Sequence, residues 1–226
     1  MNFLAHCLIG ARVAGPCSDS MGNGSYFPAH SSEPPDEAWQ GSLIAGGFLG
    51  DFLKGRVPVD MPAALSLGVR LHRRVDAYSN RAPLILRSCE RFPAELRRLA
   101  PVFVDIIADH LLAMSWSAHH PEVLADFTGT AYSSIAEHRD WLPESGQQFL
   151  DYAASSDLFA RYQEWPVVER ALHSVARRIR RPELGARAAA VSLDLYQDLT
   201  ADFETYFPDI LQHAGEWTKE QITAAR

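Results

Sequence analysis

Apolar residues recur along most of the chain at three- and four-residue spacing, which is the spacing of one face of an α-helix. Val191, Leu195, Leu199 and Phe203 form the clearest stripe, and it predicts the buried face of a long helix. No stretch shows the sustained alternation of apolar and polar residues that is typical of half-buried strands. The pattern therefore predicts an all-α protein.

Prolines and helix-capping residues divide this pattern into segments. Asp60 followed by Pro62 is typical of a helix start, since aspartate caps the first turn and proline fits within it. Segment 43–55 is apolar and carries glycines that permit close helix packing, although they weaken its helix propensity. The signals predict a bundle of roughly eight to ten helices, over 2–12, 62–78, 83–91, from Pro93, 102–117, 121–137, from Pro143, 167–180, along 191–203 and from Pro208.

Residues 13–41 interrupt the pattern, because they are rich in glycine, proline, serine, asparagine and aspartate and contain few apolar residues. Such a segment buries too little apolar surface to offset the entropy lost on ordering. We therefore expect a single helical domain over residues 1–226, with a flexible insert at about 13–41.

Composition and charge narrow the possible partners. A hydrophobic fraction of 47% fits a globular chain with a core, and the net charge of −7 argues against general nucleic-acid binding. Apart from Lys54 and Lys219, the residues counted as Lys or Arg are all arginines, which favour planar contacts with phosphate and carboxylate groups. Arginine clusters can dock an acidic partner or simply form solvated helix faces; they lie at 70–74, 87–98 and 177–181.

Cysteine usage and the N-terminal stretch bear on the compartment. Cys7, Cys17 and Cys89 are odd in number and widely spaced, which fits a reducing compartment. The apolar N-terminal stretch is too short for a membrane span and lacks the basic start of a signal peptide. We expect a cytoplasmic protein that does not bind membranes, and the sequence leaves its oligomeric state open.

Two predicted helices carry acidic and imidazole side chains inside apolar runs. Asp105 and Asp109 are four residues apart and so share a helix face, with His110 beside them. His72 and Asp76 repeat the four-residue spacing on another helix. Because charged groups are rarely buried unless they are paired or bind a metal, these side chains predict a metal site between helices.

His6 and Asp51 also lie in apolar surroundings and join the candidates. Mixed imidazole and carboxylate sets suit Mn²⁺, Fe²⁺ or Zn²⁺, and such an ion lowers the pKa of a water molecule. Arg73 and Arg74 could then hold a phosphoryl oxygen, so the chemistry predicted is metal-assisted hydrolysis of a phosphate ester. The candidate metal ligands are His6, Asp51, His72, Asp76, Asp105, Asp109 and His110, and the candidate catalytic residues are Asp51, His72, Arg73 and Arg74.

Each candidate also has a purely structural interpretation. His6 can be a packed core histidine, Asp51 can pair with Lys54, and His72 can bond Asp76 along one turn. The aspartates on the other helix can pair with a core arginine. Taken together, however, several polar groups in apolar runs each require a partner, and one metal ion satisfies them jointly.

Several short motifs resemble the acyl carrier protein phosphodiesterase family. They are Met1–His6, Gly50–Gly55, Leu71–Asp76, Asp105–Trp116, Leu142–Pro143 and Phe203–Pro208, and they span nearly the whole chain except 13–41. The resemblance implies a cytoplasmic bacterial hydrolase that cuts 4′-phosphopantetheine from a serine of holo-acyl carrier protein. It also implies a distant, all-helical relationship to the HD phosphohydrolases.

The resemblance further implies a divalent metal, Mn²⁺ above all, with Mg²⁺, Fe²⁺ or Co²⁺ as alternatives. By this match, Asp51 is the aspartate needed for activity, and the other shared polar positions are His6, His72, Asp76, Asp109 and His110. The chain departs from the pattern in two ways. Segment 13–41 is longer than expected, and the order Asp109-His110 reverses the His-Asp order of HD enzymes, so ligand roles cannot be transferred by motif order.

Three functions stay open at this point. The first is a metal-dependent phosphodiesterase acting on holo-acyl carrier protein, whose strongly acidic surface the arginine clusters at 87–98 or 177–181 would dock. In it, Arg73 or Arg74 is expected to contact the phosphodiester. The second is an HD-like phosphohydrolase for a nucleotide or another small phosphoester. The third is a helical interaction module whose buried polar groups pair internally.

Overall fold

The computed structural model describes residues 2–14 and 37–224, and within these residues it is built from helices alone, with no strand. The expected all-α class is confirmed. The α-helices are α1 (Phe3–Ala14), α2 (Glu37–Leu49), α3 (Ala63–Ser79), α4 (Pro83–Glu90), α5 (Ala100–Met114), α6 (Leu124–Glu137), α7 (Glu144–Ser156), α8 (Leu158–Arg161), α9 (Trp165–Arg178), α10 (Glu183–Asp194) and α11 (Tyr196–Ala224). Two 3-10 helices, η2 (Trp116–Ala118) and η3 (Arg139–Trp141), connect them.

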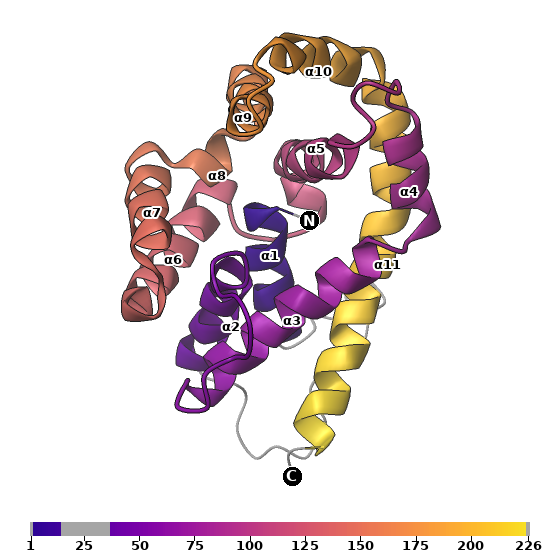
Figure 1. Ribbon diagram of the computed structural model, residues 1–226. Helices are drawn as coiled ribbons and strands as arrows, with labels where there is room; N and C mark the ends of the chain where they lie inside the picture. Colours follow the sequence, from indigo (N-terminus) through magenta and orange to yellow (C-terminus); the bar gives the residue numbers. More distant parts are fainter. Residues whose placement is uncertain (1, 15–36, 225–226) are drawn as a thin grey trace.

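Helices α1, α2 and α3 pack so closely that their backbones nearly touch, and the long α11 runs beside α3 (Figure 1). A Cβ atom added to Gly46 of α2 would lie 2.6 Å from the Cα of Gly68 on α3. One added to Gly47 would lie 2.7 Å from the carbonyl oxygen of His6 on α1. The glycines expected to permit close packing do so here, and the short interhelical distances bring polar side chains of α1 and α3 together.

A buried ion cluster joins α4 to α11. Asp202 of α11 is fully buried and accepts hydrogen bonds from Ser88 Oγ and from Arg91 Nε, each at 2.9 Å, and it pairs with Arg87 as well. Arg91 also pairs with Asp198 at 3.1 Å. A buried carboxylate is tolerated when several donors compensate its lost hydration. Two arginines of the 87–98 cluster are therefore paired with a carboxylate of the protein itself, which limits their availability to an acidic partner.

Several helix limits differ from the sequence-based expectations. Residues 13–14 belong to α1 and 37–41 to α2, so helix replaces both ends of the expected insert, and its middle, 15–36, lies outside the described residues. The helix expected from Pro93 is a series of turns over 94–99. The stripe at 191–203 is divided between α10 and α11.

The last helix does not restart at Pro208, because this proline lies inside the continuous α11. A proline removes one backbone hydrogen bond from a helix, and the buried neighbours Phe207 and Ile210 anchor the two sides of the interruption in the core. Among the described residues, no helix combines the length and the apolar character needed to cross a membrane.

Candidate functional site

The close packing of α1 and α3 against α2 brings His6, His72 and Asp76 into one group. Asp76 Oδ1 lies 3.1 Å from His6 Nε2, and Asp76 Oδ2 lies 3.2 Å from His72 Nε2. The two imidazole rings stack with their centroids 3.9 Å apart. Among the described residues, these three offer ligand atoms close enough together to share one metal ion.

His72 is held in an orientation that suits a metal ligand. Its Nδ1 donates a hydrogen bond to the carbonyl oxygen of Gly47 at 2.7 Å, so the ring proton of the neutral form resides on Nδ1. The lone pair of Nε2 then faces Asp76 Oδ2, and two acceptors 3.2 Å apart repel unless a cation lies between them or His72 is protonated. Metal-binding histidines are commonly fixed by such a carbonyl partner.

The protonation states also suit metal binding. Burial, followed by the charge of His72, lowers the pKa of His6 to about 3, so its imidazole is neutral at neutral pH. Burial alone would raise the pKa of Asp76, but the two imidazoles beside it, His6 first and then His72, outweigh burial and hold that pKa well below its usual range. Neutral imidazole and ionised carboxylate are the forms that bind metals.

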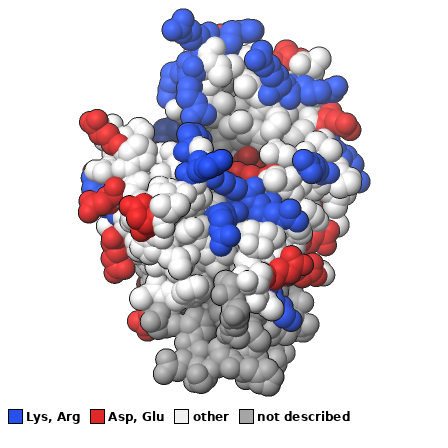
Figure 2. Space-filling model, turned by 60° about the horizontal axis from the view of Figure 1, so that its bottom comes forward, with Lys and Arg blue, Asp and Glu red and all other residues white. Residues whose placement is uncertain are grey.

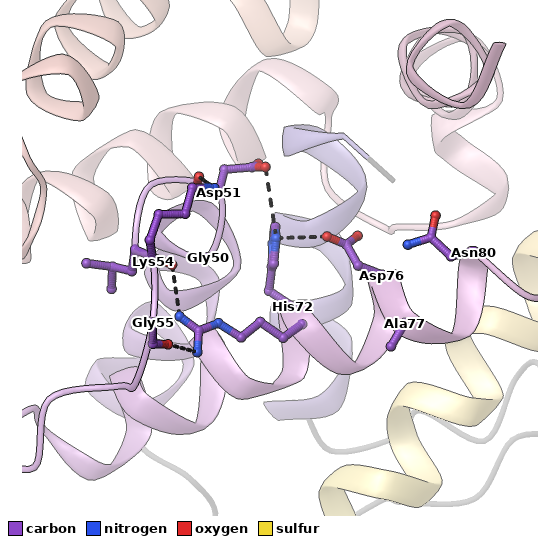
Figure 3. Close-up of a pocket in the computed structure, with 10 residues that line it drawn as sticks. Gly50, Asp51, Lys54, Gly55, His72, Asp76, Ala77 and Asn80 are labelled. Carbon is purple, nitrogen blue, oxygen red and sulfur yellow. Dashed lines mark hydrogen bonds and ion pairs between the residues drawn. The ribbon is translucent and has the colours of Figure 1, made fainter. Parts of the chain in front are cut away.

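Asp51 approaches the group from the end of α2. Its Oδ1 lies 4.0 Å from His72 Nε2, and burial raises the pKa of the carboxyl group above its ordinary value (Figure 3). Gly50 makes this approach possible, because a Cβ atom at that position would lie 2.2 Å from Cγ of His72. Asp51 is thus placed beside the three-residue group, on the side of His72.

A pocket of about 430 Å³ opens beside this group. Sequence reasoning missed two of its residues as candidates, Lys54 and Asn80, both of which line the pocket (Figure 3). Arg73 lines it too, whereas Arg74 is outside the lining and donates from Nε to His213 Nε2 on α11 at 3.0 Å. The full lining consists of Gly50, Asp51, Leu53, Lys54, Gly55, His72, Arg73, Asp76, Ala77 and Asn80.

The structure does not bring Asp105, Asp109 or His110 into the group of potential ligands. His110 Nδ1 donates to the carbonyl oxygen of Tyr162 at 2.6 Å, and its Nε2 lies 3.1 Å from the hydroxyl of Tyr196. These two contacts satisfy both ring nitrogens. The contacts of His110 are thus those of a structural histidine buried between α5 and its neighbours.

Asp109 caps the N-terminus of α1. Its two carboxylate oxygens accept hydrogen bonds from the backbone N–H groups of Leu4 and Ala5 at 2.9 and 3.0 Å, and the side chain is fully buried. The first N–H groups of a helix have no partners within the helix, so a carboxylate from elsewhere in the chain satisfies them. Because His6 follows directly, Asp109 supports the site from behind. No sequence spacing could reveal this contact, since the partners are over 100 residues apart.

The Asp109 cap leads to a prediction about stability in the metal-free protein. Burial raises the pKa of Asp109 to about 7, although the two backbone N–H groups oppose this. The pKa in the unfolded chain is about 4, so the stability contributed by the protonated form is lost as the pH rises from about 4 to 7. Asparagine does not titrate. The stability advantage of the wild-type protein over Asp109→Asn should therefore shrink by on the order of 1 kcal/mol per pH unit in this range.

Urea unfolding of both proteins in a metal chelator, at several pH values from 4 to 8, measures this difference. His6 and the other titrating groups are common to both proteins and cancel in the comparison. A difference in unfolding free energy that stays constant with pH would contradict the assigned environment of Asp109.

Taken together, the described residues define an all-helical protein with a mixed imidazole and carboxylate group beside an open polar pocket. Residues 35–210 match the family model described as acyl carrier protein phosphodiesterase. The chain belongs to this family. His6 lies before the matched range, so its place in the site rests on the geometry.

Similar proteins carry the same description. The protein named acyl carrier protein phosphodiesterase from Yersinia pestis is 32% identical over 76% of this chain and 90% of its own length. Those of the same name from Serratia proteamaculans and Escherichia coli O6:H1 are 33% and 31% identical, each over 77% of this chain and 91% of their length. No solved structure is significantly similar to this chain.

Proposed function

We propose that this protein is a metal-dependent phosphodiesterase that hydrolyses 4′-phosphopantetheine from holo-acyl carrier protein to give apo-acyl carrier protein. Family membership supports the reaction and the substrate. The observation that carries the metal dependence is the pair of facing acceptors, His72 Nε2 and Asp76 Oδ2, at the edge of an open pocket.

His6, His72 and Asp76 would hold the ion, with Asp51 completing the set from the end of α2. The donors are two imidazole nitrogens and carboxylate oxygens, a set that suits Mn²⁺, which we propose as the ion; Mg²⁺, Fe²⁺ and Co²⁺ are alternatives. When bound, a divalent ion supplies Lewis-acid chemistry, since it lowers the pKa of a water molecule and offsets negative charge on phosphoryl oxygens.

The protein's own groups then have defined tasks in the hydrolysis. A water oxygen bonds to phosphorus, the bond from phosphorus to the serine oxygen breaks, and that oxygen takes up a proton. Asp51 lines the pocket, so a carboxylate oxygen that does not hold the ion would be placed to accept the proton of the attacking water. The carbonyl of Gly47 keeps His72 in one tautomer and orientation throughout.

The proposed partner is an acidic protein, and the surface charge is consistent with that. In Figure 2, Lys and Arg side chains gather along the top and across the middle of one face, whereas acidic side chains lie mainly at its edges. Among the described residues, no ion pair engages Arg177, Arg178 or Arg180 at the end of α9. They remain the stronger candidates for docking, because Arg87 and Arg91 bind Asp202. We place this activity in the cytoplasm, where the buried Cys7 and Cys89 would stay reduced.

The test is a mass measurement of the carrier protein after incubation with the enzyme and Mn²⁺. We expect holo-acyl carrier protein to lose the mass of its prosthetic group with wild-type enzyme, and to keep it with the Asp51→Ala variant. A panel of nucleotides in the same buffer tests the alternative of a small-molecule phosphohydrolase. Hydrolysis of nucleotides without any change in the carrier protein would overturn the proposed substrate, and retained activity in Asp51→Ala would overturn the site.

A further inference from the structure

The loop after α2 is held in place by Arg73. This arginine donates one hydrogen bond from each terminal nitrogen to the loop, to the carbonyl oxygens of Gly55 at 2.7 Å and Leu53 at 2.8 Å (Figure 3). Gly55 has a φ of +76°, a conformation that favours glycine. Because the guanidinium is rigid and planar, two such contacts fix both its position and the backbone of the loop.

Lys54 is in a different situation on the same loop. Lys54 lines the pocket, and its ammonium group donates one hydrogen bond, to the backbone carbonyl oxygen of Asp51 at 2.8 Å. A lysine has three N–H donors, so two are left for a ligand. No carboxylate pairs with Lys54 among the described residues. Its flexible stem also lets the charge move toward an anion without disturbing the loop backbone.

Besides the ion that Asp51 and Asp76 would hold, cationic side chains of the lining can compensate the charge of an anionic substrate. Asp51 and Asp76 both line the pocket, and they would repel a phosphate group that approached without compensation. Arg74 cannot supply that charge from its observed position, since it contacts His213 away from the lining. Lys54 and Arg73 remain as the cations of the lining, and Arg73 is committed to the loop.

We propose that Lys54 contacts the phosphate of the substrate and that Arg73 is a positioning residue for the loop that carries Lys54 and Asp51. This assignment rests on the phosphodiesterase function proposed for the same pocket. It replaces the expectation that Arg73 or Arg74 binds the phosphodiester directly. It also separates the two cations experimentally, because one acts through charge at the ligand and the other through the structure of the loop.

Binding of 4′-phosphopantetheine and of pantetheine, which lacks the phosphate, gives a direct test. The dissociation constant of pantetheine divided by that of 4′-phosphopantetheine, measured by calorimetry on the Mn²⁺-loaded protein, isolates the contribution of the phosphate. In Lys54→Met this ratio should fall by about 10- to 100-fold, the range for a hydrogen bond between charged groups. Lys219→Met removes the other lysine, which is exposed on α11, and should leave the ratio unchanged.

Hydrogen exchange of the amides at 51–55 reports on the second part of the proposal. Exchange should be faster in Arg73→Met and in Arg73→Lys, since lysine keeps the charge but cannot contact two carbonyls in the same way. It should be unchanged in Lys54→Met. An unchanged ratio of dissociation constants in Lys54→Met would overturn the inference. So would an Arg73→Met variant that loses the preference for the phosphate-bearing ligand while its amides at 51–55 exchange at the wild-type rate.

The binding test of Lys54 can succeed or fail independently of the hydrolysis test of the proposed function. A wild-type protein that prefers the phosphate-bearing ligand through Lys54, yet leaves holo-acyl carrier protein intact, would refute the reaction and retain the Lys54 assignment. If the wild-type protein hydrolyses the carrier protein while Lys54→Met keeps the full phosphate preference, the reaction is retained and the Lys54 assignment is refuted. If the wild-type protein shows no preference for the phosphate-bearing ligand, the inference is wrong.

Discussion

Replacing Asp76 with asparagine should reduce hydrolysis of holo-acyl carrier protein by on the order of a thousandfold, because an ion in the site supplies several kcal/mol of charge stabilisation. Asp76 is the carboxylate that lies within 3.2 Å of both His6 and His72. Asparagine has nearly the same shape, so the helices should stay in place. It lacks the negative charge, however, and presents one acceptor instead of two.

The Asp76→Asn variant should also bind Mn²⁺ more weakly than the wild-type protein, and calorimetry of the metal-free proteins measures this independently of catalysis. Asp209→Asn is the matched control, since it makes the same chemical change at an exposed position on α11. We expect the control to keep wild-type affinity and rate. Wild-type Mn²⁺ affinity in Asp76→Asn would show that the ion, if any, binds elsewhere.

The central pair of the candidate site could be predicted from the sequence because it depends on local geometry. His72 and Asp76 are four residues apart on one helix, and this spacing alone places them side by side. His6 and Asp51 are candidates because they lie in apolar surroundings and match shared motifs, and the structure places both next to the pair. The distances between helices that decide this arrangement come from Gly46, Gly47 and Gly68, whose packing role was predictable only in part.

Asp109 shows where the same reasoning fails. A buried aspartate beside a histidine in an apolar helix has the same sequence pattern whether it binds a metal or caps another helix. The difference lies in the two backbone N–H groups of Leu4 and Ala5, which the fold places against its carboxylate. Lys54 was overlooked for a similar reason, since the role we propose for it follows from Arg73 being engaged with the loop carbonyls.

The buried carboxylates that join helices and the carboxylates that line the pocket need different experiments. Asp109 and Asp202 are both fully buried carboxylates, and each is compensated by hydrogen bonds that hold one helix against another. Loss of either group should appear first as loss of stability. Asp51 and Asp76 are partly exposed to the pocket, with about 39% and 38% of the side chain accessible, so their loss should appear first in metal binding and rate.

Gly50→Ala should lower activity by about a hundredfold or more, the effect expected when a catalytic group is displaced by about 1 Å. The added methyl group would lie 2.2 Å from Cγ of His72, which is far inside van der Waals contact. His72 has little freedom to move away, because its ring is tied to the carbonyl of Gly47 and stacked on His6. Either the ring or the end of α2 that carries Asp51 must shift.

The same substitution should destabilise the fold by roughly 1–3 kcal/mol, the usual cost of forcing an extra group into a packed site. Gly129→Ala is the control, since nothing lies within 4 Å of its added Cβ on the exposed side of α6. That control should be more stable than the wild-type protein by about 0.5–1 kcal/mol, because alanine favours the helix. Urea unfolding and the carrier-protein mass assay, run on both variants, test the pair of expectations. Wild-type rates in Gly50→Ala would mean that the position of His72 relative to Asp51 does not limit the reaction. A site that depends on both residues would then be wrong, and His6 and Asp76 would remain as its ligands.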